Sequence, residues 1–325
     1  MKAILFNLIL AVLCLFSAYS QEKVDLNQYP HEIISNKNVT MKVFTPDPEK
    51  GLYRATRFDW SGIIGSVQYK GHEYYGYWKD RQDPAFHEDL TGPAEGFIEP
   101  GLGYEEAKSG GKFIRIGVGI LEKPDEESYA MFATYKILDH GKWKTEQGKD
   151  WISFTHIMNS DIGYGYIYTK TIRLKSDGFS IEHSLENTGE KAIETDQFNH
   201  NFLMIDNKQS GPPFKIIFPY EISTPDDPKG FLKIDENQLI FTNKLESRSN
   251  VFLNITGFSN KASDHQVTVI DQDSGTGMTF SVNKPLYRMA FWACKTTLCP
   301  ENFIWISVKP GQTEHWTSDY TLFVK

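Results

Sequence analysis

The sequence predicts an antiparallel all-β protein, and three observations support this. Aromatic and β-branched runs of about five to ten residues follow one another from Val39 onward, separated by Gly, Asp, Asn and Pro. Within many of these runs apolar and polar residues alternate, as they do in half-buried strands. No apolar pattern of helical period continues beyond about two turns. Strands rather than helices are therefore expected to build the core.

The first twenty residues have the features of an export signal. Lys2 precedes an apolar stretch over 3–16, and a small-x-small cleavage site follows at 18–20. The stretch is too short and wrongly flanked for a membrane span, and Cys14 lacks the small preceding residue of a lipoprotein signal. We expect an exported, periplasmic or secreted chain without a membrane anchor. Residues 21–325 show no linker or break in composition, so we expect one β-sandwich domain there.

The overall charge limits the classes of partner. The formal net charge is −8, and it becomes −9 once residues 1–20 are removed with Lys2, their one charged side chain. An acidic chain without a basic stripe argues against nucleic acid and against anionic lipid as partners. A few local arginines could still hold an anionic sugar. The sequence does not indicate an oligomeric state.

Alternation and turn residues locate several strands. Residues 165–174 and 179–185 alternate on either side of a turn at 176–178, and a turn at 187–189 leads to the strand that carries His200. These three strands are predicted to form a meander. A hairpin is predicted over 265–282, and a final strand pair is predicted to turn at Pro310 and Gly311.

Residues 195–207, TDQFNHNFLMIDN, present one histidine between two amides. Thr195, Gln197 and Asn199 alternate with apolar positions, so this polar face is expected to line a site, with Asn199 helping to orient His200. The alternative is a buried histidine that the neighbouring amides satisfy. This segment alone does not distinguish a site histidine from a buried structural one, and other parts of the sequence are needed.

Aromatic residues make up 14% of the chain, and most of them are expected in the core. Two clusters, 74–78 and 291–292, lie at turn-like positions, where flat rings such as those of Trp78 and Trp292 often stack on sugars. Together with export, an all-β fold and an acidic surface, these clusters favour carbohydrate as the ligand.

Three stretches carry a resemblance to a known family: YRATRFDWSGIIGSVQYKGHEYYG, GYIYTKTIRLKSDGFSIEHSLENTGEKAIETDQFNHNFL and VKPGQTEHW. They resemble the opening strands, the middle and the closing strand of the galactose mutarotase-like superfamily, which includes the aldose 1-epimerases. The resemblance implies an antiparallel β-supersandwich and a chain that acts on a sugar.

The resemblance also implies site residues. His200 matches the family's sugar-facing histidine, a general acid, and Glu301 falls near the position of its catalytic base. In the segment GPAEGF, Glu95 stands where the family tends to have a second histidine, and we include it as a third catalytic candidate. This exchange of a histidine for a carboxylate is a departure from simple mutarotation.

Two arginines are candidates for binding the substrate by neutralising the carboxylate of a uronate. Arg57 lies in YRATRFD, and Arg115 lies inside an otherwise apolar strand. An arginine in such a strand is seldom left without a partner, so an ion pair with Glu95, Glu105 or Asp59 is the alternative role for Arg115. Asn199, Trp78 and Trp292 complete the candidate substrate-binding residues.

Two cysteines remain after residues 1–20 are removed. Cys294 and Cys299, in CKTTLC, are expected to pair as a disulfide in an oxidising compartment, with free thiols as the alternative. The polar loop HEDLTGPAEGF fits no metal-site spacing, and a GxGxxG phosphate loop with its flanking strand and helix is missing from the sequence. We therefore expect neither a metal nor another cofactor.

Two reactions suit one acid and one base on a sugar. In β-elimination from a uronate, a base removes the proton beside the carboxylate and an acid assists the C4 oxygen, while nearby cations stabilise the carbanion. In mutarotation, a base takes the anomeric hydroxyl proton and an acid protonates the ring oxygen. Export, the missing histidine and the candidate arginines favour elimination, of the lyase or dehydratase type. Aldose 1-epimerisation and a non-catalytic sugar-binding module are the alternatives.

Overall fold

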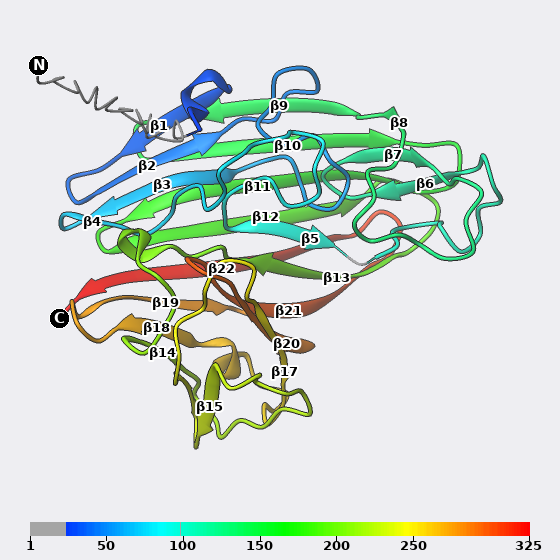
Figure 1. The fold of residues 1–325 in the computed structure, drawn as a ribbon. Coiled ribbons are helices and arrows are strands. Elements are labelled where there is room, and N and C mark those ends of the chain that lie inside the picture. The colour runs from blue at the N-terminus through cyan, green and yellow to red at the C-terminus, as the bar shows by residue number, and fades with distance from the viewer. Residues whose placement is uncertain (1–23, 98) are drawn as a thin grey trace, which may run out of the picture.

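The structure is a computed structural model that describes residues 24–97 and 99–325. The predicted export signal, residues 1–20, lies outside the described residues. Two antiparallel sheets form most of the molecule, and the smaller packs across one face of the larger (Figure 1). The antiparallel all-β prediction is confirmed.

The larger sheet has ten strands, and its middle strands are the longest. Polar and apolar side chains alternate along them, so each strand turns one face toward the core. The strands, in spatial order, are β15 (Leu232–Asp235), β16 (Gln238–Phe241), β14 (Phe214–Ile217), β18 (Val267–Asp271), β19 (Thr276–Val282), β22 (Thr313–Val324), β12 (Gly178–Asn187), β11 (Gly165–Lys175), β10 (Trp151–Asn159) and β9 (Lys142–Gln147).

The smaller sheet has five strands, and part of it is buried on both faces. Its residues between Leu298 and Phe303, for example, are all buried. The strands, in spatial order, are β17 (Val251–Ile255), β20 (Arg288–Ala293), β21 (Leu298–Val308), β13 (Ile193–His200) and β5 (Ala94–Phe97).

Two small sheets and three short helices complete the described part of the chain. No helix in that part is long or apolar enough to cross a bilayer. The first small sheet contains β1 (His31–Ser35), β2 (Val39–Phe44), β3 (Ile63–Tyr69) and β4 (His72–Glu73), and the second contains β6 (Lys112–Arg115), β7 (Gly119–Glu122) and β8 (Ile137–Asp139). The 3₁₀ helices are η1 (Leu26–Gln28), η2 (Ile205–Asn207) and η3 (Ala262–His265).

Two predicted strand pairings are wrong, and both fail for the same reason. β11 and β12 pair as predicted, but β13 leaves the large sheet and pairs with β21 and β5. β21 and β22 likewise do not pair with each other, because the turn at Pro310 and Gly311 takes the chain from the small sheet to the large one. Short turns here connect strands across the sandwich as well as within a sheet. The predicted hairpin of β18 and β19 is confirmed.

A cluster of buried charges joins the two sheets. Lys170 Nζ on β11 lies 2.6 Å from Asp59 Oδ2 and 3.5 Å from Glu95 Oε2 on β5. His183 Nε2 on β12 lies 2.8 Å from Glu95 Oε1, and its Nδ1 lies 3.2 Å from the carbonyl oxygen of Trp316. Lys170 and His183 thus both contact the Glu95 carboxylate inside the sandwich.

The predicted disulfide does not form, and both cysteines are free. The buried Sγ of Cys299 accepts a hydrogen bond from the backbone N–H of Phe202, at 3.1 Å, so it is held in the core. Cys294 lies just past the end of β20, where its backbone N–H donates to the Thr297 carbonyl. Burial raises the pKa of both thiols and keeps them protonated.

This state of the cysteines has a measurable consequence. A chain of residues 21–325, unfolded without reductant, is expected to bind two equivalents of an alkylating reagent, at Cys294 and Cys299. In the folded protein the reaction should be much slower, because both thiols are protonated and largely buried. Mass spectrometry of the alkylated peptides counts the additions. If the unfolded, unreduced chain takes up no reagent, the two cysteines form the predicted disulfide and are not free.

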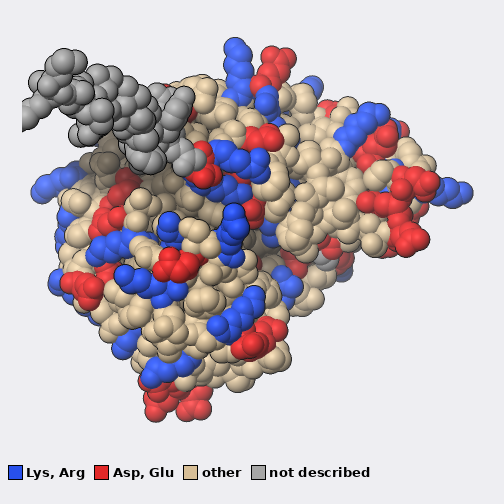
Figure 2. Space-filling view, viewed as in Figure 1, with Lys and Arg blue, Asp and Glu red and all other residues tan. Residues whose placement is uncertain are grey.

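Basic and acidic side chains are interspersed over the face drawn in Figure 2, and neither sign forms a continuous stripe among the described residues visible there. The acidic net charge of the sequence is thus spread over this face. The distribution of charge on this face therefore does not by itself indicate a binding site.

Candidate functional site

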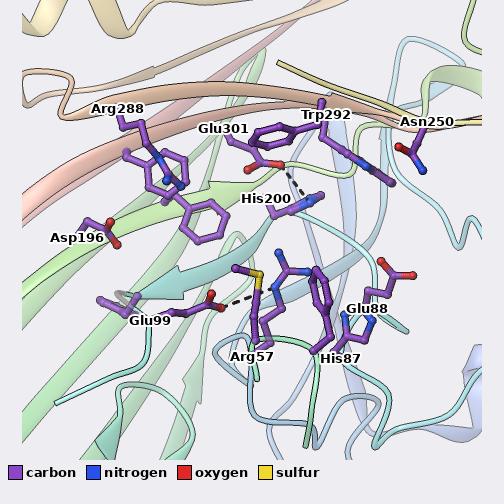
Figure 3. Close-up of a pocket in the computed structure, with 16 residues that line it drawn as sticks. Arg57, His87, Glu88, Glu99, Asp196, His200, Asn250, Arg288, Trp292 and Glu301 are labelled. Carbon is purple, nitrogen blue, oxygen red and sulfur yellow. Dashed lines mark ion pairs between the residues drawn. The ribbon is translucent and has the colours of Figure 1, made fainter. Parts of the chain in front are cut away.

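A cavity of about 680 Å³ lies against one face of the small sheet (Figure 3). Adjacent strands of this sheet supply its floor, and loops around residues 57, 87, 99 and 131 supply its walls. The floor side chains are Asp196, Phe198 and His200 on β13, Glu301 and Phe303 on β21, Arg288 and Trp292 on β20, and Phe252 on β17.

The face of β13 that lines the cavity is the opposite of the predicted one. His200 faces the cavity with Phe198 and Asp196, whereas Asn199 and its odd-numbered neighbours face the large sheet. Side chains alternate along a strand, so residues two apart share a face. Asp196 lies four residues before His200 on the same strand and therefore on the same face. The choice of His200 as a site residue could thus have identified Asp196 from the sequence.

His200 and Glu301 come together as the resemblance implied. Their Nε2 and Oε1 atoms are 3.2 Å apart, and the exposed fractions of their side chains are 7% and 8%. The ring of Phe202 stacks on His200 with centroids 3.9 Å apart, and the rings of Phe58 and Trp292 approach at steep angles. Three aromatic rings therefore exclude water from the pair, yet both residues still line the cavity.

This apolar enclosure shifts both pKa values toward the neutral forms. Burial lowers the pKa of His200 well below its usual value, and the charge of Arg57 adds to the effect. Burial raises the pKa of the Glu301 carboxyl to about 7, although Arg57 and Arg288 oppose the shift. Between these two values the pair holds one proton, which is the state an acid and base working together require.

Three buried nitrogen atoms of residues that line the cavity have no hydrogen-bond partner among the described residues: Nδ1 of His200, Nδ1 of His87 and Nε of Arg57. Buried polar atoms are nearly always satisfied, and exceptions often mark a ligand site. Arg57 approaches the pair from the opposite side of the cavity, and its Nε lies 3.8 Å from Glu99 Oε1 (Figure 3). The cavity therefore presents polar groups from two sides to whatever it holds.

Arg115 stands behind this wall and does not line the cavity. Its Nη2 donates to the carbonyl oxygen of Arg57 at 2.6 Å and lies 3.6 Å from Glu99 Oε1. The side chain is 2% exposed. Glu99 is thus an acidic neighbour of Arg115, and the contact with the Arg57 carbonyl helps to hold the Arg57 loop in place.

Asp196 and Arg288 occupy the far end of the cavity from Trp292 (Figure 3). Burial raises the pKa of Asp196 to about 6, with the charge of Arg288 opposing the shift. The guanidinium of Arg288 lies over the ring of Phe303, 3.8 Å from its centroid. Sequence reasoning missed this end of the site together with Glu99, because the residues come from separate strands and a loop.

Glu95 lies in the buried charge cluster, away from the cavity. Burial alone would raise its pKa, but His183, Lys170 and the Tyr168 hydroxyl hold the pKa of this carboxyl below its ordinary value. Asn199 Nδ2 donates to Glu95 Oε1 at 3.3 Å and pairs in register with it. Both residues therefore anchor the end of β13 from behind, next to His200.

The two candidate tryptophans occupy different places. Trp292 lines the cavity. Trp78 is packed beside it, with its ring stacked on Phe202 and its Nε1 donating to the Leu90 carbonyl at 3.1 Å. Within residues 24–97 and 99–325, no three His, Cys, Asp or Glu side chains group as a metal site would need.

Solved structures share this architecture. No protein-family model and no curated protein sequence matches the chain. The galactose mutarotase-like protein from Lactobacillus casei superposes with a TM-score of 0.53, covering 90% of this chain and 100% of its own at 12% identity. The chain has the galactose mutarotase-like fold.

Two further structures support this assignment. The Slr1438 protein from Synechocystis sp. PCC 6803 has a TM-score of 0.57 at 12% identity, and the alignment covers 92% of this chain and 97% of that one. The GalM/aldose epimerase homologue from C. elegans has a TM-score of 0.54 at 11% identity, with 90% and 98% covered. The galactose mutarotase-like fold thus accounts for most of the chain, and the resemblance inferred from the sequence is confirmed at the level of fold.

Proposed function

We propose that this protein is a carbohydrate enzyme of the aldose 1-epimerase type, which interconverts the anomers of a reducing sugar. The observation that carries the proposal is the buried pair of His200 and Glu301, which shares one proton inside a cavity. The fold supports it, since relatives in structure are described as mutarotase-like or epimerase homologues.

The reaction needs only a proton acceptor and a proton donor. One member of the pair takes the proton from the anomeric hydroxyl while the other protonates the ring oxygen, so the C1–O5 bond breaks and an open-chain aldehyde forms. After rotation about C1–C2, the same two groups return the protons in the reverse sense and the ring closes as the other anomer. No net proton is gained or lost.

The groups that line the cavity suit a sugar with many hydroxyls. Four carboxyl groups, of Glu88, Glu99, Asp196 and Glu301, lie there with the two guanidinium groups of Arg57 and Arg288. Glu301 holds its proton up to about pH 7 and Glu88 pairs with Lys79, so the cavity has no clear excess of negative charge. Carboxylates and guanidinium groups together suit the many hydroxyls of a neutral pyranose.

Elimination from a uronate is the second candidate, and one observation favours it. Arg57 bears its positive charge close enough to act on both His200 and Glu301, and its Nε has no hydrogen-bond partner among the described residues. A cation at this place could neutralise a substrate carboxylate while the base removes the neighbouring proton. This reaction was preferred from the sequence, and it now ranks second because the structural neighbours are described as mutarotase-like or epimerase homologues.

Polarimetry of freshly dissolved α-anomers separates the candidates. The protein is expected to accelerate the decay of optical rotation for at least one of a panel of aldoses, and His200→Ala should abolish the acceleration. Ultraviolet absorbance with uronate oligosaccharides is followed in parallel, and a rise there without accelerated mutarotation would establish elimination instead. Silence in both assays, with sugar binding retained in His200→Ala, would indicate a binding module and overturn the proposal.

The pH dependence of kcat/KM follows from the shared proton. The one-proton state of the pair exists between the lowered pKa of His200 and the Glu301 pKa of about 7. We therefore expect kcat/KM to be level in mildly acid buffer and to fall above pH 7, by about tenfold per unit. Initial rates of mutarotation across this range test it. A kcat/KM that rises through pH 7 would mean that the active pair carries no proton.

A further inference from the structure

A second cavity, of about 820 Å³, adjoins the first. Glu88, Asn250 and Trp292 line both, so the two cavities meet at these side chains, and together they are called the cleft here. In Figure 3 Trp292 and Asn250 lie together at the end of the first cavity opposite Asp196. The proton-transfer pair thus sits in only one half of a longer cleft.

The first cavity alone is large enough for one sugar ring. Pockets that enclose whole drug-sized ligands measure about 300–1,000 Å³, and a single pyranose is smaller than such ligands. A monosaccharide substrate would leave the second cavity without a role. The volume of the cleft therefore indicates a substrate that extends past the reacting ring.

Trp292 is suited to separate two sugar units. Its three ring neighbours, His200, Trp78 and Phe202, meet it at steep angles of 61–72°. Among the described residues no ring stacks on either face of this half-buried indole. An indole face left open in a cleft can pack against the C–H face of a pyranose, as aromatic side chains pack against flat apolar surfaces.

The second cavity offers hydrogen-bond donors to a further unit. Arg248 and Lys295 line it, and neither forms an ion pair with another described residue. Lys79, in contrast, is held by Glu88 and Asp89. Guanidinium and ammonium groups without an ion-pair partner, beside an indole that no other ring stacks on, are the chemistry that recognises the hydroxyls of a sugar ring.

We propose that the cleft binds an oligosaccharide, with its reducing-end unit at His200 and Glu301 and the next unit beyond Trp292 in the second cavity. The orientation rests on the proposed function. Only the reducing-end unit has a free anomeric hydroxyl, so it alone can react at the pair, and the chain must leave from another of its hydroxyls. The second cavity is where that chain continues.

Isothermal titration of the full mature chain tests the proposal with matched pairs of reducing sugars. The panel consists of glucose, galactose, xylose and glucuronate, each measured against its 1,4-linked disaccharides, in the wild type and in Glu301→Gln. For at least one pair the disaccharide is expected to bind about tenfold more tightly, which corresponds to about 1.4 kcal/mol. Because binding is measured, this outcome does not depend on turnover.

Ser249→Trp provides the matched variant. Ser249 lines only the second cavity, and an indole there should remove the advantage of the disaccharide while leaving the monosaccharide affinity unchanged. Lys295→Ala, which only removes a hydrogen-bond donor, is expected to reduce the tighter binding of the disaccharide in part. It replaces Ser249→Trp as the test if the larger side chain disturbs folding. Disaccharides that bind no more tightly than their monosaccharides would overturn the inference.

The two proposals fail in different ways. If the protein exchanges the anomers of monosaccharides but binds disaccharides no more tightly, the proposed function stands and the oligosaccharide proposal is wrong. If disaccharides bind more tightly, Ser249→Trp abolishes this difference and no anomer exchange is seen, the oligosaccharide-binding cleft stands and the epimerase proposal is wrong. A panel in which no sugar binds at all would overturn both.

Discussion

Replacing Glu301 with Gln is expected to lower kcat for anomer exchange by about 100- to 10,000-fold, the usual contribution of a positioned acid or base. Gln keeps the size of the side chain and a hydrogen-bonding group near His200, but it can neither take nor give a proton. Sugar affinity should therefore change far less than kcat. Initial rates and isothermal titration on the same preparation separate the two quantities.

The same substitution is expected to make the fold more stable above pH 7. An isolated glutamate titrates near 4.5, whereas the folded protein binds the Glu301 proton up to about pH 7. Stability is therefore lost as pH rises from about 4.5 to 7 and stays lower above it. The shift corresponds to about 3 kcal/mol, which Gln avoids. Urea unfolding at pH 5 and pH 8 measures the difference.

Glu88→Gln is the control for both effects. Glu88 also lines the cavity, but it pairs with Lys79 at 2.8 Å and its side chain is 30% exposed. Its replacement should leave kcat within about threefold, since it lies outside the proton-transfer pair. Equal loss of kcat in the two variants, or an active Glu301→Gln, would contradict the assignment of the acid–base pair.

Lys170→Met is expected to destabilise the fold by about 3–5 kcal/mol, because it leaves buried carboxylates without their cation. The Lys170 side chain is 1% exposed and bridges Asp59 and Glu95, both fully buried. Burial lowers its pKa, but the two carboxylates outweigh this and raise it, so the lysine is charged. Met fills a similar volume, so the effect should come from charge rather than from packing.

Lys175→Met on the same strand is the matched control. Lys175 pairs with Asp319 at the surface, where its side chain is 46% exposed, and such pairs contribute below about 1 kcal/mol. Chemical unfolding of both variants gives the comparison. Similar stability losses in the two would mean that the buried cluster contributes no more than a surface pair.

The strands were predictable from the sequence, and the pairing of some of them was not. Alternation and turn residues located β11, β12, β18 and β19 well, since both signals are local. The passage of β13 and β22 to a different sheet depends on the partners that each strand meets across the sandwich. A short turn within one sheet and a short turn between two sheets have the same local sequence features. Local sequence therefore could not decide which strands pair.

The site was predictable in its central pair and not in its surroundings. His200 and Glu301 were found through the resemblance, while the polar alternation of β13 pointed to the wrong face. Asn199 donates to the buried Glu95, and Gln197 donates to Asn199, so the polar face of β13 meets the buried charge cluster. Such a face has the same local pattern as a substrate face. Glu99 and Arg288 reach the cavity only through long-range packing.

Exchange spectroscopy by proton NMR tests the central claim most directly, that the His200–Glu301 pair moves a proton on a bound sugar. Exchange between the α- and β-anomer signals of a reducing sugar at equilibrium is measured at pH 6 with wild-type protein and with Glu301→Gln. We expect exchange well above the buffer rate with the wild type and a return to the buffer rate with the variant. Exchange at the buffer rate with the wild type, under conditions where titration shows the sugar bound, would contradict the account.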